Sequence, residues 1–213
     1  MSTTWCWMTD MPSSVLHSEA LAPGLRVGLL GGTFDPPHHG HLHAARTAMR
    51  RLKLDRVWWL VSPQNPLKAR QASDLDRRMT LVSELARDPG MVVSDIEARI
   101  GTTRTIDLLH HLRTRKPDVK FVWLMGADNL SGIHRWAHWQ GVFASCPVAV
   151  IARPTDAVRA RLSPAARYFA HARIPESAAA TLADQEAPAW TYLTGRLHPH
   201  ASSDIRRARQ QTR

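Results

Sequence analysis

The sequence predicts an α/β fold in which an open parallel sheet is flanked by helices. Short apolar runs typical of buried strands alternate with stretches of helical periodicity, which is the first reason for this prediction. The second reason is size, because 213 residues with 44% hydrophobic content are enough to build a full core. We expect one domain over residues 25–213, preceded by an extension of uncertain order over residues 1–24.

The first strand and the first helix are joined by a glycine turn. Residues 25–30 (LRVGLL) form an apolar run that ends at Gly31 and Gly32, as a buried strand of a parallel sheet does. Residues 40–52 then space their apolar side chains almost as a helix requires. The sequence therefore predicts a strand, a turn and a helix in direct succession.

The remaining elements continue this alternation, without repeats or low-complexity blocks. Further strands are expected at residues 55–61, 91–94, 119–125 and 147–152, with residues 190–193 as a sixth. Helices are expected at residues 75–86 and 103–113, and a loop at residues 63–68. The Ala- and Pro-rich stretch 153–188 is expected to contain a helix and loops.

The glycine turn, GGTFDPPHHGHL from Gly31 to Leu42, has the character of a phosphate site. Glycines remove the Cβ atoms that would keep a ligand away, and the first N–H groups of the following helix have no partner within that helix. Neither the Rossmann pattern G-x-G-x-x-G nor the Walker pattern fits this segment. What remains is H-x-G-H, in which His38 and His41 can donate hydrogen bonds to phosphate oxygens.

Four histidines in this turn raise the alternative of a metal site: His38, His39, His41 and His43. Adjacent and i+2 spacings direct these side chains to different sides of a helix start, and no Cys or acidic residue completes a tetrahedral set. We therefore expect no metal site and interpret His39 and His43 as surface residues.

The segment GTFDPPHHGH resembles the signature G-x-F-x-P-x-H-x-G-H of the nucleotidyltransferase superfamily. Within that superfamily, the longer form and several later segments resemble the bacterial nicotinate-mononucleotide adenylyltransferases. The resemblance implies a Rossmann-like sheet of the nucleotidyltransferase type and transfer of the adenylyl group of ATP to nicotinate mononucleotide. The implied products are nicotinate adenine dinucleotide and pyrophosphate, in NAD biosynthesis, with Mg²⁺ accompanying ATP.

The resemblance also implies site residues. His38 and His41 are the implied catalytic residues. The implied ATP contacts are Gly31, Gly32, Thr33, Phe34, His38, His41, Lys68, Ser202, Ser203 and Arg206. The implied contacts of nicotinate mononucleotide are Gly32, Thr33, Thr105, Gly126, Asp128 and Trp136.

The acceptor contacts are identified from GADNLSGIHRW and GTTRTIDLL. Trp136 is favoured for stacking on the pyridine ring, with core packing as the alternative for Trp136 and for Trp139. Asp128 is a ligand contact, a helix cap or both. Arg104 replaces the usual Tyr of the family, so its role is open.

The ATP contacts of the later segments also depart from the family pattern in places. Leu67 replaces the usual His before Lys68, and Lys68 is either a phosphate contact or a solvated charge. ASSDIR resembles the family segment S-S-T-x-I-R, with Ala201 in place of the first Ser. Ser202 and Ser203 are also good helix caps.

Charge and cysteine usage limit other functions. A formal charge of +10 raises the alternative of a nucleic-acid-binding module, but the basic residues are scattered and the only dense run is Arg206 to Arg209. Cys6 and Cys146 form no framework, which fits a reducing, cytoplasmic compartment. The apolar runs are too short for a membrane span, and residues 1–24 have no Lys or Arg of a signal peptide.

We therefore expect small-molecule substrates and neither a nucleic acid nor a membrane as partner. A homo-oligomer is left open. A phosphopantetheine or another adenylyl acceptor would share the first motif, but the spacing of Asp128 and Trp136 favours a pyridine nucleotide.

Overall fold

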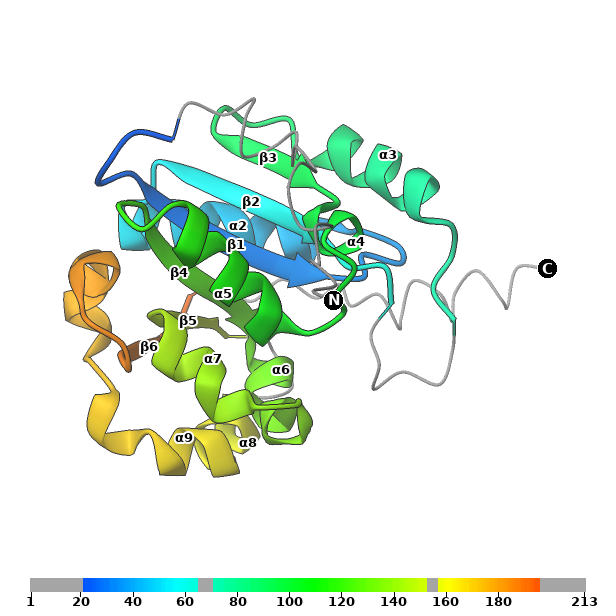
Figure 1. Ribbon diagram of the computed structural model, residues 1–213. Helices are drawn as coiled ribbons and strands as arrows, with labels where there is room; N and C mark the ends of the chain where they lie inside the picture. The colour runs from blue at the N-terminus through cyan, green and yellow to red at the C-terminus, as the bar shows by residue number, and fades with distance from the viewer. Residues whose placement is uncertain (1–20, 65–70, 153–156, 196–213) are drawn as a thin grey trace, which may run out of the picture.

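A six-stranded sheet forms the centre of the molecule in the computed structural model, which describes residues 21–64, 71–152 and 157–195 (Figure 1). The strand order is β3-β2-β1-β4-β5-β6, and every neighbouring pair is parallel. The strands are β1 (Arg26–Gly32), β2 (Arg56–Val61), β3 (Met91–Ser94), β4 (Lys120–Gly126), β5 (Val148–Ile151) and β6 (Trp190–Leu193). The predicted α/β class and all six predicted strands are confirmed.

Helical segments connect the strands. They are α2 (His39–Leu52), α3 (Leu75–Leu85), α4 (Ile96–Arg99), α5 (Thr105–Arg115), α6 (Ala127–Gly132), η1 (Ile133–Arg135), α7 (Trp139–Ser145), α8 (Ala157–Arg161), α9 (Pro164–Tyr168), η2 (Ala170–Ala172) and η3 (Glu176–Asp184). The predicted helix 103–113 begins two residues later than expected, because Arg104 has extended backbone angles. The described part of stretch 153–188 contains several short helical segments rather than one helix.

Apolar side chains cover both faces of the sheet. Leu42, Ala45 and Leu52 of α2 pack on one face together with η3, and Leu108 and Leu112 of α5 pack on the other together with α7. Figure 1 shows α5 and α7 in front of the sheet and α2 behind it. Successive residues of β2 and β4 alternate between these two cores, which explains why both strands are continuous apolar runs.

The predicted start of the domain lies within the described residues. Leu21 and Leu25 pack against one of the two cores, and the Gly24 N–H donates to the carbonyl of Asp118 at 2.7 Å. The boundary between an extension and a domain at residue 24 stays a prediction. No helix in the described part of the chain is both long and apolar enough to cross a membrane.

The order of the strands positions the functional site. In a 3-2-1-4-5-6 sheet the chain direction of the connections reverses between β1 and β4, and ligands bind outside the carboxyl ends of the strands at this point. Gly31 and Gly32 end β1 there, and Gly126 ends β4 beside them.

Candidate active site

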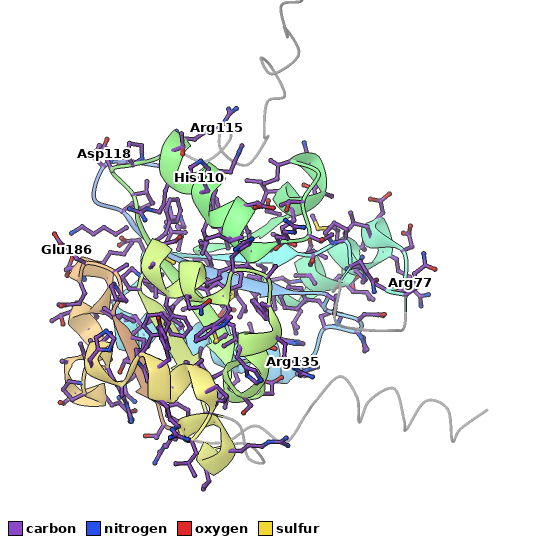
Figure 2. The ribbon with its side chains drawn as sticks, turned by 60° about the horizontal axis from the view of Figure 1, so that its bottom comes forward. Arg77, His110, Arg115, Asp118, Arg135 and Glu186 are labelled. Atoms are coloured by element: carbon purple, nitrogen blue, oxygen red, sulfur yellow. The ribbon has the colours of Figure 1, made fainter. Side chains whose placement is uncertain are left out.

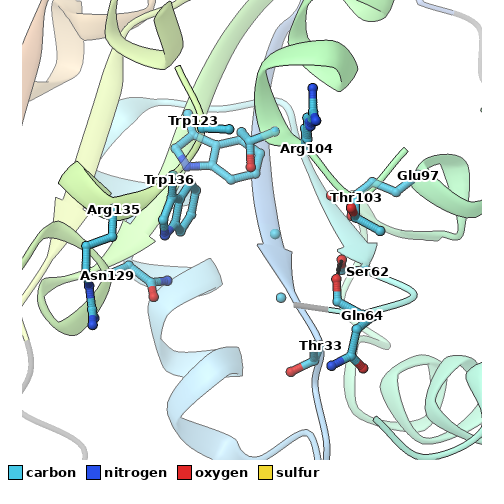
Figure 3. A pocket seen from close by; sticks show the side chains of 14 residues that line it. Thr33, Ser62, Gln64, Glu97, Thr103, Arg104, Trp123, Asn129, Arg135 and Trp136 are labelled. Carbon is cyan, nitrogen blue, oxygen red and sulfur yellow. Dashed lines mark hydrogen bonds between the residues drawn. The ribbon is translucent and has the colours of Figure 1, made fainter. Parts of the chain in front are cut away.

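A pocket of about 440 Å³ opens at the carboxyl ends of β1, β2 and β4. Its lining combines residues from several separate stretches of the chain: Gly31, Gly32, Thr33, Ser62, Gln64, Glu97, Thr103, Arg104, Thr105, Trp123, Asn129, Arg135, Trp136 and Ala137. Figure 3 shows Trp123, Trp136 and Asn129 on one side and Ser62, Gln64 and Thr103 on the other, with Thr33 between them. The pocket therefore has an aromatic side and a polar side.

The two glycines at the end of β1 bring aromatic rings close to the backbone. A Cβ atom at Gly31 would lie 2.5 Å from Cη2 of Trp123, and one at Gly32 would lie 3.2 Å from Cζ of Phe34. The glycines therefore leave room for side chains of the protein itself as well as for a ligand.

Helix α2 begins with a capping box built from two histidines. Nδ1 of His38 accepts from the Gly40 N–H at 3.1 Å, and Nδ1 of His41 accepts from the His38 N–H at 3.2 Å. Because Nδ1 acts as an acceptor in both rings, the proton of each neutral imidazole lies on Nε2. A hydrogen bond from either ring to a phosphate would therefore be donated by Nε2–H.

Packing fixes these rings further. The centroids of the two imidazoles lie 3.7 Å apart in a stacked arrangement, and Phe34 meets His41 edge-on at 5.0 Å. His38 is 5% exposed and Phe34 is 2% exposed. A contact of Phe34 with ATP would therefore have to come from its backbone, which has a left-handed φ of 47°.

The two candidate tryptophans have different surroundings. Trp136 lines the pocket directly after η1. Trp139 begins α7 and packs edge-on against Tyr168 at 5.4 Å and Phe169 at 5.8 Å. Both side chains are half-buried and pack against the core, and of the two only Trp136 also lines the pocket.

The other predicted acceptor contacts lie in or beside the pocket. Thr105 lines it at the first turn of α5. Gly126 is the N-cap of α6 and Asp128 is exposed in its first turn, whereas the next residue, Asn129, lines the pocket. Because Gly126 occupies the cap position, the alternative in which Asp128 caps this helix is wrong.

Four predicted ATP contacts lie outside the described residues: Lys68, Ser202, Ser203 and Arg206. His39 is exposed and His43 is half-buried. Within the described ranges, no three His, Cys, Asp or Glu side chains gather in a way that would hold a metal ion.

Sequence reasoning missed a buried carboxyl group in the pocket. Glu97 in α4 is 4% exposed, and this burial raises its pKa from 4.5 to about 7, although a hydrogen bond with Ser62 works in the opposite direction. The Ser62 hydroxyl also donates to the carbonyl of Gln64 at 3.2 Å. The single hydroxyl proton of Ser62 therefore has two possible acceptors, the Glu97 carboxylate and the Gln64 carbonyl. A protonated Glu97 would no longer need this proton, because it could itself donate to the hydroxyl oxygen.

Several other lining residues were not predicted either: Ser62, Gln64, Thr103, Trp123, Asn129, Arg135 and Ala137. Ser62 and Gln64 directly follow β2, so the rule that ligands bind at the carboxyl ends of strands would have identified them.

The lining also has a surplus of positive charge. Arg104 and Arg135 line the pocket, and their guanidinium groups form no ion pair within the described part of the chain. Among the described residues of the lining Glu97 is the one acidic residue, and its raised pKa keeps much of it uncharged near neutral pH. Other arginines, such as Arg77 and Arg115, project from separate parts of the surface (Figure 2). The pocket therefore favours an anionic ligand.

The chain is similar to proteins of known sequence. A model of the cytidylyltransferase-like family matches residues 29–208. A relative from a Caulobacter species, described as a "probable nicotinate-nucleotide adenylyltransferase", is 59% identical over 187 residues, which cover 87% of this chain and 98% of the relative. A relative from Cereibacter sphaeroides with the same description is 52% identical over 180 residues, or 84% of this chain and 95% of the relative.

Solved structures support the fold. The Plasmodium falciparum nicotinic acid mononucleotide adenylyltransferase complexed with NaAD superposes with a TM-score of 0.65 at 16% identity, covering 86% of this chain and 83% of that chain. The same protein complexed with APC gives a TM-score of 0.63. Together with the matches in sequence, this places the chain in the cytidylyltransferase-like family, among its nicotinate-nucleotide adenylyltransferases.

Proposed function

We propose that the protein transfers the adenylyl group of ATP to nicotinate mononucleotide and so makes nicotinate adenine dinucleotide and pyrophosphate for NAD biosynthesis. One observation carries this proposal: a single pocket joins the glycine end of β1, which leads into the histidine-capped start of α2, to a wall formed by Trp136. The names of the relatives described above support the same proposal, because they specify this acceptor.

The ATP side of the site would be built on the β1–α2 junction. Gly31, Gly32 and Thr33 line the pocket, and the positive end of the α2 helix dipole favours an anion there. His38 and His41 would add Nε2–H donors to the phosphates, where negative charge grows during transfer. Lys68, Ser202, Ser203 and Arg206 complete the proposed ATP contacts.

The acceptor side would be built around Trp136. An indole face stacks well on an electron-poor pyridine ring, and both rings are rigid, so little conformational entropy is lost. Thr105, Gly126 and Asp128 would bind the rest of the nucleotide, together with Gly32 and Thr33. The surplus of positive charge from Arg104 and Arg135 suits an acceptor that carries a carboxylate as well as a phosphate.

The chemistry needs little from the protein beyond positioning and charge neutralisation. The 5′-phosphate of the acceptor, with a second pKa of about 6 by analogy with phosphorylated side chains, is mostly dianionic at neutral pH and needs no general base. One of its oxygens would attack the α-phosphorus of ATP in line. The bond from that phosphorus to the bridging oxygen breaks, and pyrophosphate leaves with the electron pair.

Magnesium would enter with ATP as part of the substrate. Mg²⁺ keeps several water ligands and is usually bound through substrate phosphates and one or two carboxylates. The described residues supply no cluster of metal ligands, which is compatible with a cation held mainly by phosphate oxygens and water. Chelation with EDTA should therefore stop turnover and leave the thermal unfolding of the substrate-free protein unchanged.

Pyrophosphate release measured with different acceptors tests the proposed function. Release should depend on nicotinate mononucleotide, and mass spectrometry should identify nicotinate adenine dinucleotide in equal amount. Phosphopantetheine in place of the pyridine nucleotide should give no release. Release with phosphopantetheine alone would instead indicate another member of the superfamily, and release with neither would contradict adenylyl transfer.

A further inference from the structure

Arg78 is a buried arginine outside the predicted site. It lies in the first part of α3 and is 1% exposed, although an arginine is rarely buried unless its charge is compensated. Burial lowers its pKa, and the nearby carboxylates of Asp35 and Asp74 act in the opposite direction. Within the described residues Arg78 forms no ion pair, so its donors are used in another way.

The guanidinium donates four hydrogen bonds to main-chain carbonyls of three separate segments. Nη1 donates to Thr33 at 2.8 Å and to Ser62 at 2.7 Å. Nη2 donates to Pro63 at 3.0 Å, and Nε donates to Ser73 at 2.8 Å. One planar group therefore joins the ends of two strands to the start of a helix.

These carbonyls lie where the sheet opens into the pocket. The Ser62 N–H donates to the carbonyl of Gly32 at 2.9 Å, which continues the parallel ladder one step beyond β2. Beyond this step the segments that follow β1 and β2 separate. Arg78 donates to the next carbonyl of each segment, at Thr33 and Ser62. Thr33 and Ser62 line the pocket. The guanidinium of Arg78 thus bridges the two loops.

A second set of bonds fixes the same arrangement from the other side. The carboxylate of Asp35 accepts from the Ser73 hydroxyl at 2.9 Å and from the Ser73 N–H at 3.2 Å. Asp74 caps α3 by accepting from the Arg77 N–H at 2.9 Å. The segment that contains Thr33 is therefore tied to the start of α3 by a carboxylate as well as by Arg78.

We propose that Arg78 is a positioning residue for adenylyl transfer, because it holds the loops after β1 and β2 at the separation that the two substrates require. The proposal rests on the proposed function. Displacing reacting groups by about 1 Å can cost two orders of magnitude in rate. Lysine keeps the charge but offers its donors from a single nitrogen, so it cannot reproduce the four bonds of the planar fork.

The test compares Arg78→Met and Arg78→Lys with Val82→Ala. Val82 lies one turn later on the same helix, is fully buried and contacts the core rather than the pocket, so its variant lowers stability without changing the loops. Each variant is assayed well below its own Tm, with both substrates varied in turn. We expect kcat to fall at least about tenfold in both Arg78 variants, with Val82→Ala within about twofold of the wild type.

Two results would overturn the proposal. One is a folded Arg78→Lys enzyme with kcat within about twofold of the wild type, and this variant decides the matter if Arg78→Met fails to fold. The other is an equal loss of kcat in Val82→Ala, because the effect would then follow stability rather than loop position. Wild-type activity with nicotinate mononucleotide is measured in the same assay, so a failure of the proposed function is recognised separately.

Discussion

The β1–α2 junction and the facing side of the candidate site, which carries Trp136, Arg104 and Arg135, are built in different ways. On the β1–α2 side the contributing residues are nearly consecutive, and their own hydrogen bonds fix them: the histidine capping box holds His38 and His41, and Arg78 holds Thr33. On the facing side the residues come from separate segments, and Arg104 and Arg135 are exposed.

This difference corresponds to two tasks. Groups that stabilise the developing charge of a transition state must already be in place, because reorganisation during the reaction would raise the barrier. Groups that select an acceptor act on the ground state as well, and exposed side chains tolerate change. We therefore expect substitutions on the β1–α2 side to lower kcat and substitutions on the facing side to change KM for the acceptor.

His41→Asn should have the largest effect. Asparagine retains an acceptor for the His38 N–H, so the helix start is kept, but the imidazole Nε2–H is lost. We expect kcat to fall by about 10²- to 10³-fold with native circular dichroism. His39→Ala, an exposed neighbour in the same turn, is the matched control and should have near wild-type kcat. A His41→Asn enzyme within tenfold of the wild type would contradict the role of the ring.

Glu97→Gln should change how stability depends on pH. The pKa of Glu97 is about 7 in the folded protein and 4.5 ordinarily, so the folded protein binds this proton more tightly than the unfolded chain does. The stabilising contribution of the protonated group is complete below pH 4.5 and is lost as the pH rises through 7. Over this pH range the free energy of unfolding of the wild type should therefore fall by about 3 kcal/mol. The glutamine variant should not show this fall. Urea unfolding at a series of pH values measures this free energy. The same pH dependence in the wild type and the variant would contradict a raised pKa for Glu97.

Gly31→Ala should destabilise the β1 end of the pocket. The new methyl group would lie 2.5 Å from Cη2 of Trp123, so the indole or the strand has to move. Overpacking of this kind costs about 1–3 kcal/mol. Gly195→Ala is the control, because apart from its chain neighbours no atom of the described residues lies within 4 Å of its Cβ position. Equal unfolding midpoints for the two variants would show that the indole moves aside without cost.

Trp136→Ala should have the smallest effect and should affect the acceptor alone. Loss of stacking worth about 0.5–1.5 kcal/mol corresponds to a rise of about twofold to tenfold in KM for nicotinate mononucleotide at saturating ATP. Trp139→Phe should lower stability and leave this KM unchanged, because Trp139 packs on Tyr168 and Phe169. A higher KM for ATP instead would place Trp136 on the wrong side of the pocket.

The sheet was predictable because its strands are continuous apolar runs, so local pattern and final burial agree. The short helices α6 and α7 were not predicted, since each has two turns or fewer and is stabilised by packing rather than by its own periodicity. The start of α5 was placed two residues too early because the extended backbone of Arg104 leaves no local signal.

The candidate site was predictable only where its residues are contiguous. The β1–α2 junction is a single motif, so Gly31, His38 and His41 were found together. Arg78 stands beside Arg77 in the sequence, and nothing local shows that one is buried and the other exposed. The raised pKa of Glu97 depends on tertiary burial, which the residues around it in the sequence do not show.

The most direct test of a pocket with surplus positive charge on its acceptor side is the ratio of kcat/KM for nicotinate mononucleotide to kcat/KM for nicotinamide mononucleotide. The two substrates differ in one carboxylate, which becomes a neutral amide. A charge-assisted hydrogen bond to a carboxylate is worth about 1.5–3 kcal/mol, so we expect a ratio of at least about ten. A ratio near one, or a preference for the amide, would contradict it.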